Sequence, residues 1–230
     1  MTFSVCFIHG LGDDEARFSH FADDLRDSGL PCSTLRLPDC HSTAPRPNVT
    51  QLLANEIELF FSGQSPDVRK AVVAHSLGGL LALSDNRIRS IVDKFVLVEP
   101  SIRDADYSFF QILLNLPHGQ RIEQFRSMLA ERNSEIPSNY IDKLQQWSEE
   151  SITCYCKLAT NLIPNAVNYM DEVREKTTIL FGRKSWGLEK NCDNNNRNGA
   201  TLCEFMQSGH WPFVTEKNKF QQFLVDVLIM

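Results

Sequence analysis

The sequence predicts an α/β protein whose mainly parallel, six-stranded sheet carries helices on both faces. Short apolar runs rich in β-branched and aromatic residues alternate with segments in which apolar residues recur at helical spacing. The runs have almost no polar interruption, as expected of parallel strands covered on both sides. A long stretch over residues 104–176 shows only helical spacing. It therefore predicts a block of helices inserted after the strand that ends at Glu99.

Six segments have the composition of strands, and we expect them at residues 3–8, 33–37, 71–74, 94–98, 177–181 and 201–205. Helical spacing follows most of them, at residues 18–28, 52–61, 77–83 and 216–228. Gly29 is placed to end the first of these helices, and Thr215 is expected to cap the last. Strand and helix therefore alternate along both ends of the chain.

The chain has 230 residues, of which 42% are hydrophobic, so it is long enough to bury a substantial core in one domain. We expect residues 1–103 and 177–230 to form the two parts of this core. Residues 104–176, punctuated by Pro117, Pro137 and Pro164, form the helical block between them.

Charge and composition bear on partners and compartment. The net charge of −6, without a basic cluster, argues against binding to nucleic acid or to anionic membrane surfaces. No segment has the pattern of a signal peptide or the length of a membrane span, so a cytoplasmic protein is expected. The seven cysteines lie scattered along the sequence and are expected to be reduced thiols rather than metal ligands.

The predicted strand at residues 71–74 is an apolar run that leads to Ser76, and a helical pattern follows this serine. Ala74 and Gly78 flank it at two positions on either side, which matches the nucleophile-elbow pattern G-x-S-x-G with Ala74 replacing the first glycine. Small residues are needed there because a serine at the apex of so sharp a turn adopts a strained backbone with positive φ. The alternative is an ordinary strand-to-helix junction with an N-capping serine.

Three short motifs in order along the chain resemble the α/β-hydrolase-fold family, and the resemblance extends from Phe3 to the C-terminal helix. His9-Gly10 is similar to the family's oxyanion-loop dipeptide, residues 74–78 to its nucleophile elbow, and Gly209-His210 to its base loop. The resemblance implies a sheet that begins at the family's third strand. It also implies that residues 104–176 form a helical cap over the active site.

The chemistry of the motifs assigns roles to these residues. A serine hydroxyl is a poor nucleophile near neutral pH, so Ser76 needs a base, and His210 is placed by topology to supply it. The backbone N–H groups of Leu11 and Leu77 are expected to form the oxyanion hole. His20, His41 and His118 have no partner motif. His75 is expected to pack or hydrogen-bond locally, and His9 to order its loop rather than to take part in catalysis.

The acid of the triad is less obvious. In the family it usually lies about three residues after a glycine that follows the penultimate strand, where this chain has Ser185 after Gly182. A minority of the family takes the acid from the end of the preceding strand, which makes Glu99 the first choice. Asp104 and Glu189 are weaker alternatives, and a purely structural role for Glu99 stays open.

The resemblance implies a serine hydrolase of carboxylesterase or thioesterase type, which cleaves an ester, thioester or related acyl bond through an acyl-enzyme on Ser76. The partner expected is therefore a small-molecule acyl substrate, and no cofactor or metal is predicted. Apolar residues of the helical block favour an apolar acyl chain or a small aromatic group, although each can also serve packing: Phe109, Phe110, Leu113, Leu114 and Trp147. The alternative is a non-catalytic member of the family that binds a small ligand or a protein partner.

Overall fold

The computed structural model describes residues 2–38, 49–132, 136–185 and 200–229. Within these ranges a six-stranded sheet has the strand order β2-β1-β3-β4-β5-β6, and each neighbouring pair is parallel. The strands are β1 (Phe3–Ile8), β2 (Cys32–Leu35), β3 (Arg69–His75), β4 (Lys94–Val98), β5 (Thr177–Gly182) and β6 (Thr201–Phe205). The predicted fold class is confirmed, with each strand close to its expected position.

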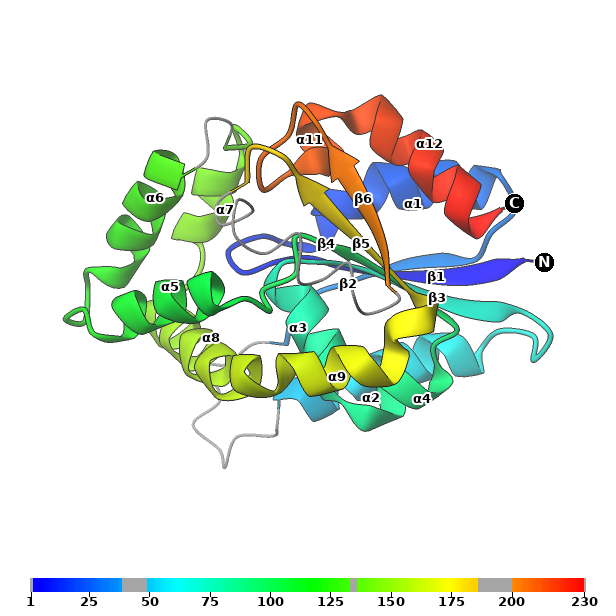
Figure 1. The fold of residues 1–230 in the computed structure, drawn as a ribbon, viewed down its shortest axis with the longest axis horizontal. Helices are drawn as coiled ribbons and strands as arrows, with labels where there is room; N and C mark the ends of the chain where they lie inside the picture. The colour runs from blue at the N-terminus through cyan, green and yellow to red at the C-terminus, as the bar shows by residue number, and fades with distance from the viewer. Residues whose placement is uncertain (1, 39–48, 133–135, 186–199, 230) are drawn as a thin grey trace.

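Helices cover both faces of the sheet (Figure 1). One face carries α1 (Ser19–Asp27), preceded by the short 3-10 helix η1 (Glu15–Phe18), together with α11 (Pro212–Thr215) and α12 (Lys217–Leu228). The other carries α2 (Val49–Ser62), α3 (Leu77–Ser84), α4 (Asn86–Ile91) and α9 (Ala166–Val173). Two covered faces explain why β1 is buried along its whole length and reads as a continuous apolar run.

The expected cap at Thr215 is wrong, because the chain is already helical before this residue. Pro212 occupies the first turn of α11, where its missing N–H costs nothing, and Thr215 ends that short helix. The Thr215 hydroxyl donates a hydrogen bond to the Trp211 carbonyl at 3.1 Å. Glu216 stands at the N-cap position of α12 instead.

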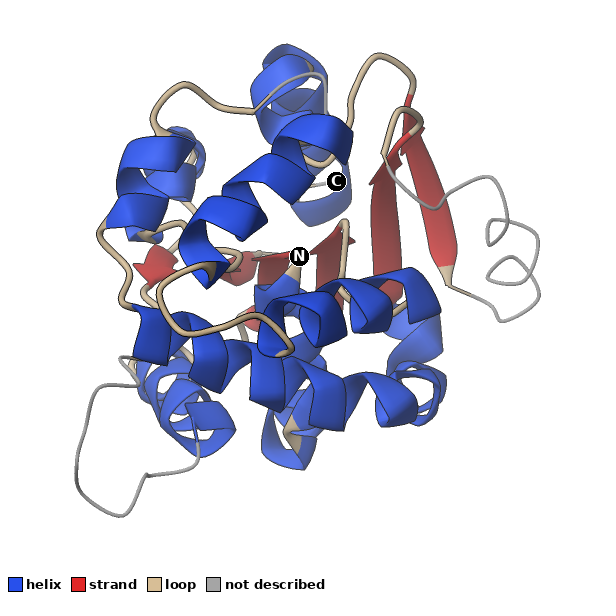
Figure 2. Cartoon of the chain, turned by 90° about the vertical axis from the view of Figure 1, so that its left-hand side faces the viewer, coloured by secondary structure: helices blue, strands red, loops and turns tan. Residues whose placement is uncertain are grey.

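The chain between β4 and β5 is helical, as predicted. It contains α5 (Asp104–Leu114), α6 (Arg121–Arg132), α7 (Tyr140–Gln145) and α8 (Glu149–Leu162), followed by the 3-10 helices η2 (Ile163–Asn165) and η3 (Arg174–Lys176) on either side of α9. We refer to α5, α6, α7 and α8 as the outer helices. They lie beyond the carboxyl edge of the sheet and come to the front in Figure 2, whereas α9 returns beside α3.

No helix within the described ranges combines the length and apolarity needed to cross a bilayer.

Candidate active site

Ser76 forms the sharp turn between β3 and α3. Its backbone has φ 51° and ψ −121°, a conformation that costs about 1–3 kcal/mol for a residue with a Cβ. The turn is fixed on both sides, since the Ser76 N–H donates to the Val98 carbonyl at 2.9 Å and its own carbonyl accepts from Gly79 and Leu80. The geometry is that of a nucleophile elbow and not of an N-cap, because the Ser76 side chain makes no capping hydrogen bond.

Two glycines let the loop after β1 lie directly against this turn. A Cβ on Gly78 would stand 2.4 Å from the His9 carbonyl oxygen, and one on Gly10 would stand 2.8 Å from His75 Nδ1. Either substitution would therefore push the loop and the turn apart. The two predicted oxyanion donors, Leu11 on the loop and Leu77 at the start of α3, belong to the two segments that meet here.

A mainly apolar pocket opens above Ser76, between the carboxyl edge of the sheet and the outer helices. Its lining residues are Leu11, His75, Ser76, Ser101, Arg103, Asp106, Phe109, Phe110, Phe125, Leu129, Tyr140, Ser185, His210 and Trp211. Of the apolar residues predicted to line it, Phe109 and Phe110 do so. Leu113, Leu114 and Trp147 serve packing instead, the alternative left open at each position, and Trp147 also lies beside a second, polar pocket.

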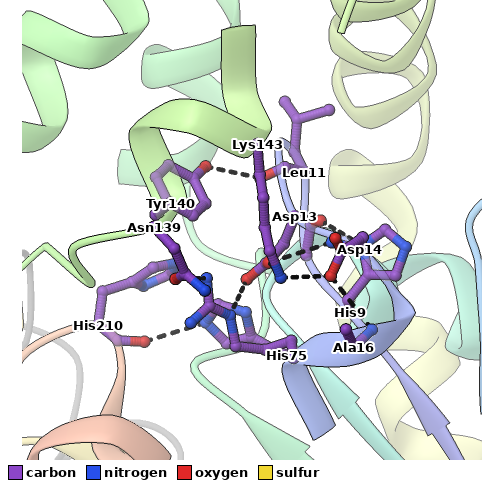
Figure 3. Close-up of polar contacts among 12 residues, drawn as sticks. His9, Leu11, Asp13, Asp14, Ala16, His75, Asn139, Tyr140, Lys143 and His210 are labelled. Atoms are coloured by element: carbon purple, nitrogen blue, oxygen red, sulfur yellow. Dashed lines mark hydrogen bonds and ion pairs between the residues drawn. The ribbon is translucent and has the colours of Figure 1, made fainter. Parts of the chain in front are cut away.

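His210 lies on the loop between β6 and α11 and lines the same pocket as Ser76, so the predicted nucleophile and the predicted base face one cavity. Its side chain is 19% exposed, and its Nδ1 lies 3.6 Å from Glu99 Oε2. The loop is held from below, because His75 Nε2 lies 3.0 Å from the His210 carbonyl oxygen (Figure 3). One ring nitrogen of His210 thus faces a carboxylate, the arrangement that stabilises an imidazolium.

Glu99 is the carboxylate at this site, and it is fully buried at the end of β4. Gly182 N–H donates to its Oε1 at 2.7 Å, and Ser185 Oγ donates to its Oε2 at 2.7 Å. The Arg103 guanidinium lies 3.7 Å from Oε2, on the same oxygen that faces His210. A buried carboxylate is costly unless it is hydrogen-bonded and paired, and Glu99 is both.

The backbone of Glu99 is strained as well. Its φ is 49°, and among the described residues only Ser76 shares a positive φ without being a glycine. Strain of about 1–3 kcal/mol is kept only where the surrounding contacts determine the conformation, as the hydrogen bond from Glu99 N to the Leu180 carbonyl at 2.9 Å does here. Each strained residue directly follows its strand, Ser76 after β3 and Glu99 after β4, and these two strands are parallel neighbours in the sheet.

At position 185 the chain has a serine where the family more often has the acid of the triad, and the structure shows what this serine contacts. It stands where the resemblance places the acid, and its hydroxyl donates to the carboxylate supplied by the neighbouring strand. Asp104, one of the alternatives, is exposed in the first turn of α5 and does not line the pocket. Glu189, the other, lies outside the described residues.

Three polar residues near Ser76 were not predicted. Ser101 is buried, and its Oγ lies 3.2 Å from Ser76 Oγ. Arg103 lines the pocket and donates two hydrogen bonds to the Asp106 carboxylate at 3.0 and 3.1 Å. Their sequence position just after β4 could have indicated them, since residues that follow parallel strands gather at the carboxyl edge of the sheet, where ligands bind.

Two further histidines support the site from within the core. Burial lowers the pKa of His75 well below its ordinary value, and the nearby His210 lowers it further. Burial also lowers the pKa of His9, whose Nδ1 donates to the Gly10 carbonyl at 2.8 Å while its Nε2 accepts from Leu37 N–H at 3.0 Å. Both rings are therefore neutral structural groups near pH 7.

Comparison with known proteins identifies the family. Residues 7–218 match the sequence profile described as the alpha/beta hydrolase family, so the chain belongs to that family. The family supports a hydrolase, without specifying the bond that is cleaved. No sequence among the curated proteins matches the chain.

Solved structures share the fold across nearly the whole chain. MenH from S. aureus is 16% identical, with a TM-score of 0.74 over 98% of this chain and 93% of its own. A thermophilic esterase from Thermogutta terrifontis is 14% identical, with a TM-score of 0.72 over 98% and 90%. The haloalkane dehalogenase DatA from Agrobacterium tumefaciens C58 is 13% identical, with a TM-score of 0.70 over 99% and 89%. At these identities the likeness concerns the fold.

Proposed function

We propose that the protein is a serine hydrolase that cleaves an ester, thioester or related acyl bond through an acyl-enzyme on Ser76. The observation that carries the proposal is the strained Ser76 elbow in a pocket shared with His210, whose Nδ1 faces the buried carboxylate of Glu99 at 3.6 Å. Nucleophile, base and orienting acid come from three neighbouring segments at one edge of the sheet.

In the proposed reaction, Ser76 Oγ attacks the substrate carbonyl carbon while His210 Nε2 accepts the hydroxyl proton. The negative charge that develops on the carbonyl oxygen is stabilised by the N–H groups of Leu11 and Leu77. Each such donor contributes about a hundredfold to a thousandfold in rate. The tetrahedral intermediate then expels an alcohol or thiol, which takes the proton from His210. Water activated by His210 releases the acid and restores Ser76.

The lining of the pocket supports an apolar acyl chain or a small aromatic group. Phe109 and Phe110 from α5 and Phe125 and Leu129 from α6 cover the side opposite the sheet, and three of the four are rings. With its carbonyl carbon at Ser76, an apolar chain would extend between α5 and α6 along these four residues. The outer helices would then act as the cap over the site.

The alternative of a non-catalytic binding protein depends on the absence of an acid at position 185. Ser185 donates a hydrogen bond to Glu99, so this absence does not leave His210 without a carboxylate. The proposal therefore has a residue for each of the three roles of nucleophile, base and acid.

A fluorophosphonate probe tests the proposal, because it modifies a serine only when base and oxyanion donors are in place. The intact mass of the wild-type protein should increase by one adduct, and peptide mapping should locate that adduct on Ser76. The Ser76→Ala variant should not react, and His210→Ala should react at least a hundredfold more slowly. An adduct on another residue, or none from neutral to mildly alkaline pH, would favour the binding protein.

A further inference from the structure

Helix α7 and the residue before it are joined to the loop after β1 by three polar links (Figure 3). Tyr140 donates its hydroxyl proton to the Leu11 carbonyl at 2.7 Å. Lys143 contacts the carboxylates of Asp13, at 3.3 Å, and Asp14. Asn139 Oδ1 accepts from Arg17 Nη2 at 3.1 Å. The loop that carries one proposed oxyanion donor is therefore held by an outer helix as well as by the core.

The burial of these groups shows that the links are built into the fold. Tyr140 is 3% exposed and Asp13 is 1% exposed. The Asp13 carboxylate is paired with Arg17 as well as with Lys143, as a buried charge requires. Burial raises the pKa of Tyr140 well above its ordinary value, so its hydroxyl keeps its proton and acts as a donor.

The links meet at the backbone of Leu11. The Leu11 N–H belongs to the same rigid peptide plane as the Gly10 carbonyl, which His9 holds through Nδ1 at 2.8 Å. The next peptide plane carries the Leu11 carbonyl, which Tyr140 holds. The two planes that flank the Leu11 α-carbon are thus each fixed by a buried side chain, one from the core and one from the outer helices.

Gly12 makes the second hold possible. Its φ is +78°, and a Cβ at this position would stand 2.6 Å from the Tyr140 hydroxyl oxygen. A side chain there would displace α7 from the loop. The close approach of Tyr140 is therefore permitted by the residue that follows Leu11.

We propose that Tyr140 is a positioning residue for the oxyanion hole, and that docking of α7 on the loop aligns the Leu11 N–H with the substrate oxygen. The outer helices thereby control the rate of the chemical step in addition to covering the pocket. This inference rests on the proposed acyl chemistry at Ser76.

The Tyr140→Phe variant tests this role because it removes one oxygen and keeps the ring. An amide that is poorly aligned stabilises the transition state less but leaves the bound substrate unaffected. With a p-nitrophenyl ester we expect kcat to fall by about tenfold and KM to stay within about twofold. The rate constant of fluorophosphonate labelling should fall by a similar factor.

Tyr155 provides the matched control. It is a fully buried tyrosine of an outer helix whose hydroxyl likewise donates to a backbone carbonyl, that of Pro38, and it does not line the Ser76 pocket. Tyr155→Phe should lower the melting temperature much as Tyr140→Phe does, yet retain the wild-type kcat and labelling rate. A kcat that falls equally in both variants would indicate a general loss of stability and would overturn the inference.

The outcomes separate this inference from the proposed function. If wild-type protein is not labelled on Ser76, the acyl chemistry fails. If it is labelled, and folded Tyr140→Phe has the wild-type kcat or changes only KM, the positioning role alone fails. Should Tyr140→Phe not fold, Lys143→Met removes a second link and leaves Tyr140 in place, and its kcat is expected to fall about threefold at unchanged KM. An unchanged kcat in that variant rejects the coupling of α7 to the loop.

Discussion

The two sides of the candidate site are supported in different ways. On the acid side, Glu99 receives hydrogen bonds from Gly182 and Ser185 at the end of β5, and the Arg103 guanidinium at the start of α5 lies 3.7 Å from its Oε2. On the oxyanion side, the loop with Leu11 is held by His9 of the core and by Tyr140 of α7. Both short hydrogen bonds to the acid thus come from the end of β5, with a longer ion pair from the start of α5, whereas the carbonyl of the residue that supplies the oxyanion donor is hydrogen-bonded directly by a side chain of α7. Substitutions at Glu99 and its partners should therefore weaken His210 as the base. Substitutions that move the Leu11 loop should weaken stabilisation of the negative charge on the substrate carbonyl oxygen.

The largest effect is expected at the base itself. His210→Ala removes the proton acceptor for Ser76, and kcat for a p-nitrophenyl ester should fall by at least about a thousandfold. Thermal melting measured by circular dichroism is the control, because the partly exposed ring can be removed without opening the core. Retention of more than a tenth of wild-type activity would assign the base to another group.

Glu99→Gln should have the next largest effect. The amide cannot stabilise the imidazolium, and it places a neutral group where Arg103 lies 3.7 Å from a carboxylate oxygen. We expect kcat to fall by about a hundredfold to ten-thousandfold with little change in KM. Activity within a few-fold of wild type would make Glu99 structural.

The double variant Glu99→Gln with Ser185→Asp sharpens this result. It moves the carboxylate from position 99 to position 185, where the family more often carries it and which lies next to position 99 in the fold. Partial recovery, by about tenfold over Glu99→Gln alone, is expected if position 185 can also reach the ring of His210. A double variant that is less active than Glu99→Gln would show that only β4 can supply the acid.

Ser185→Ala is expected to be milder. It deletes one of the two short hydrogen bonds to Glu99 and leaves the carboxylate in place. Loss of a hydrogen bond to a buried charged group costs about 1–3 kcal/mol in the free energy of unfolding. A urea titration should show this loss, and kcat should fall about fivefold to tenfold. Unchanged stability would mean that water replaces the hydroxyl.

The sequence predicts the nucleophile and the base of the site better than the residues that support them. The elbow at Ser76 and the base at His210 follow from local patterns, because each occupies a fixed place at a strand end. Glu99 was the first choice for the acid, but the strain at its backbone and the donation from Ser185 depend on two strands that meet only in the fold. Tyr140 gave no signal, since its partner Leu11 lies in a distant part of the chain and helical spacing alone says nothing about where α7 docks.

The smallest expected effect concerns pH, and it compares one buried histidine from each side. The pKa values of His75 and His9 are lowered from 6.5 in the folded protein, mainly by burial, so the unfolded chain binds more protons below about pH 6.5. Stability is therefore fully present above this pH and decreases as the pH falls towards the folded pKa values. The slope is at most about 1.4 kcal/mol per pH unit for each histidine.

His75→Gln isolates one of these contributions. The glutamine amide retains a donor for the His210 carbonyl but cannot titrate. Between about pH 5 and 6.5 the free energy of unfolding should therefore depend less on pH, and the number of protons taken up on unfolding should fall by at most about one. Urea titrations at several pH values measure this slope for the wild-type protein, His75→Gln and His9→Gln. If His75→Gln has the wild-type slope, His75 takes up its proton equally in the folded and the unfolded protein over this pH range, and the lowered pKa of the buried ring beside His210 would be wrong.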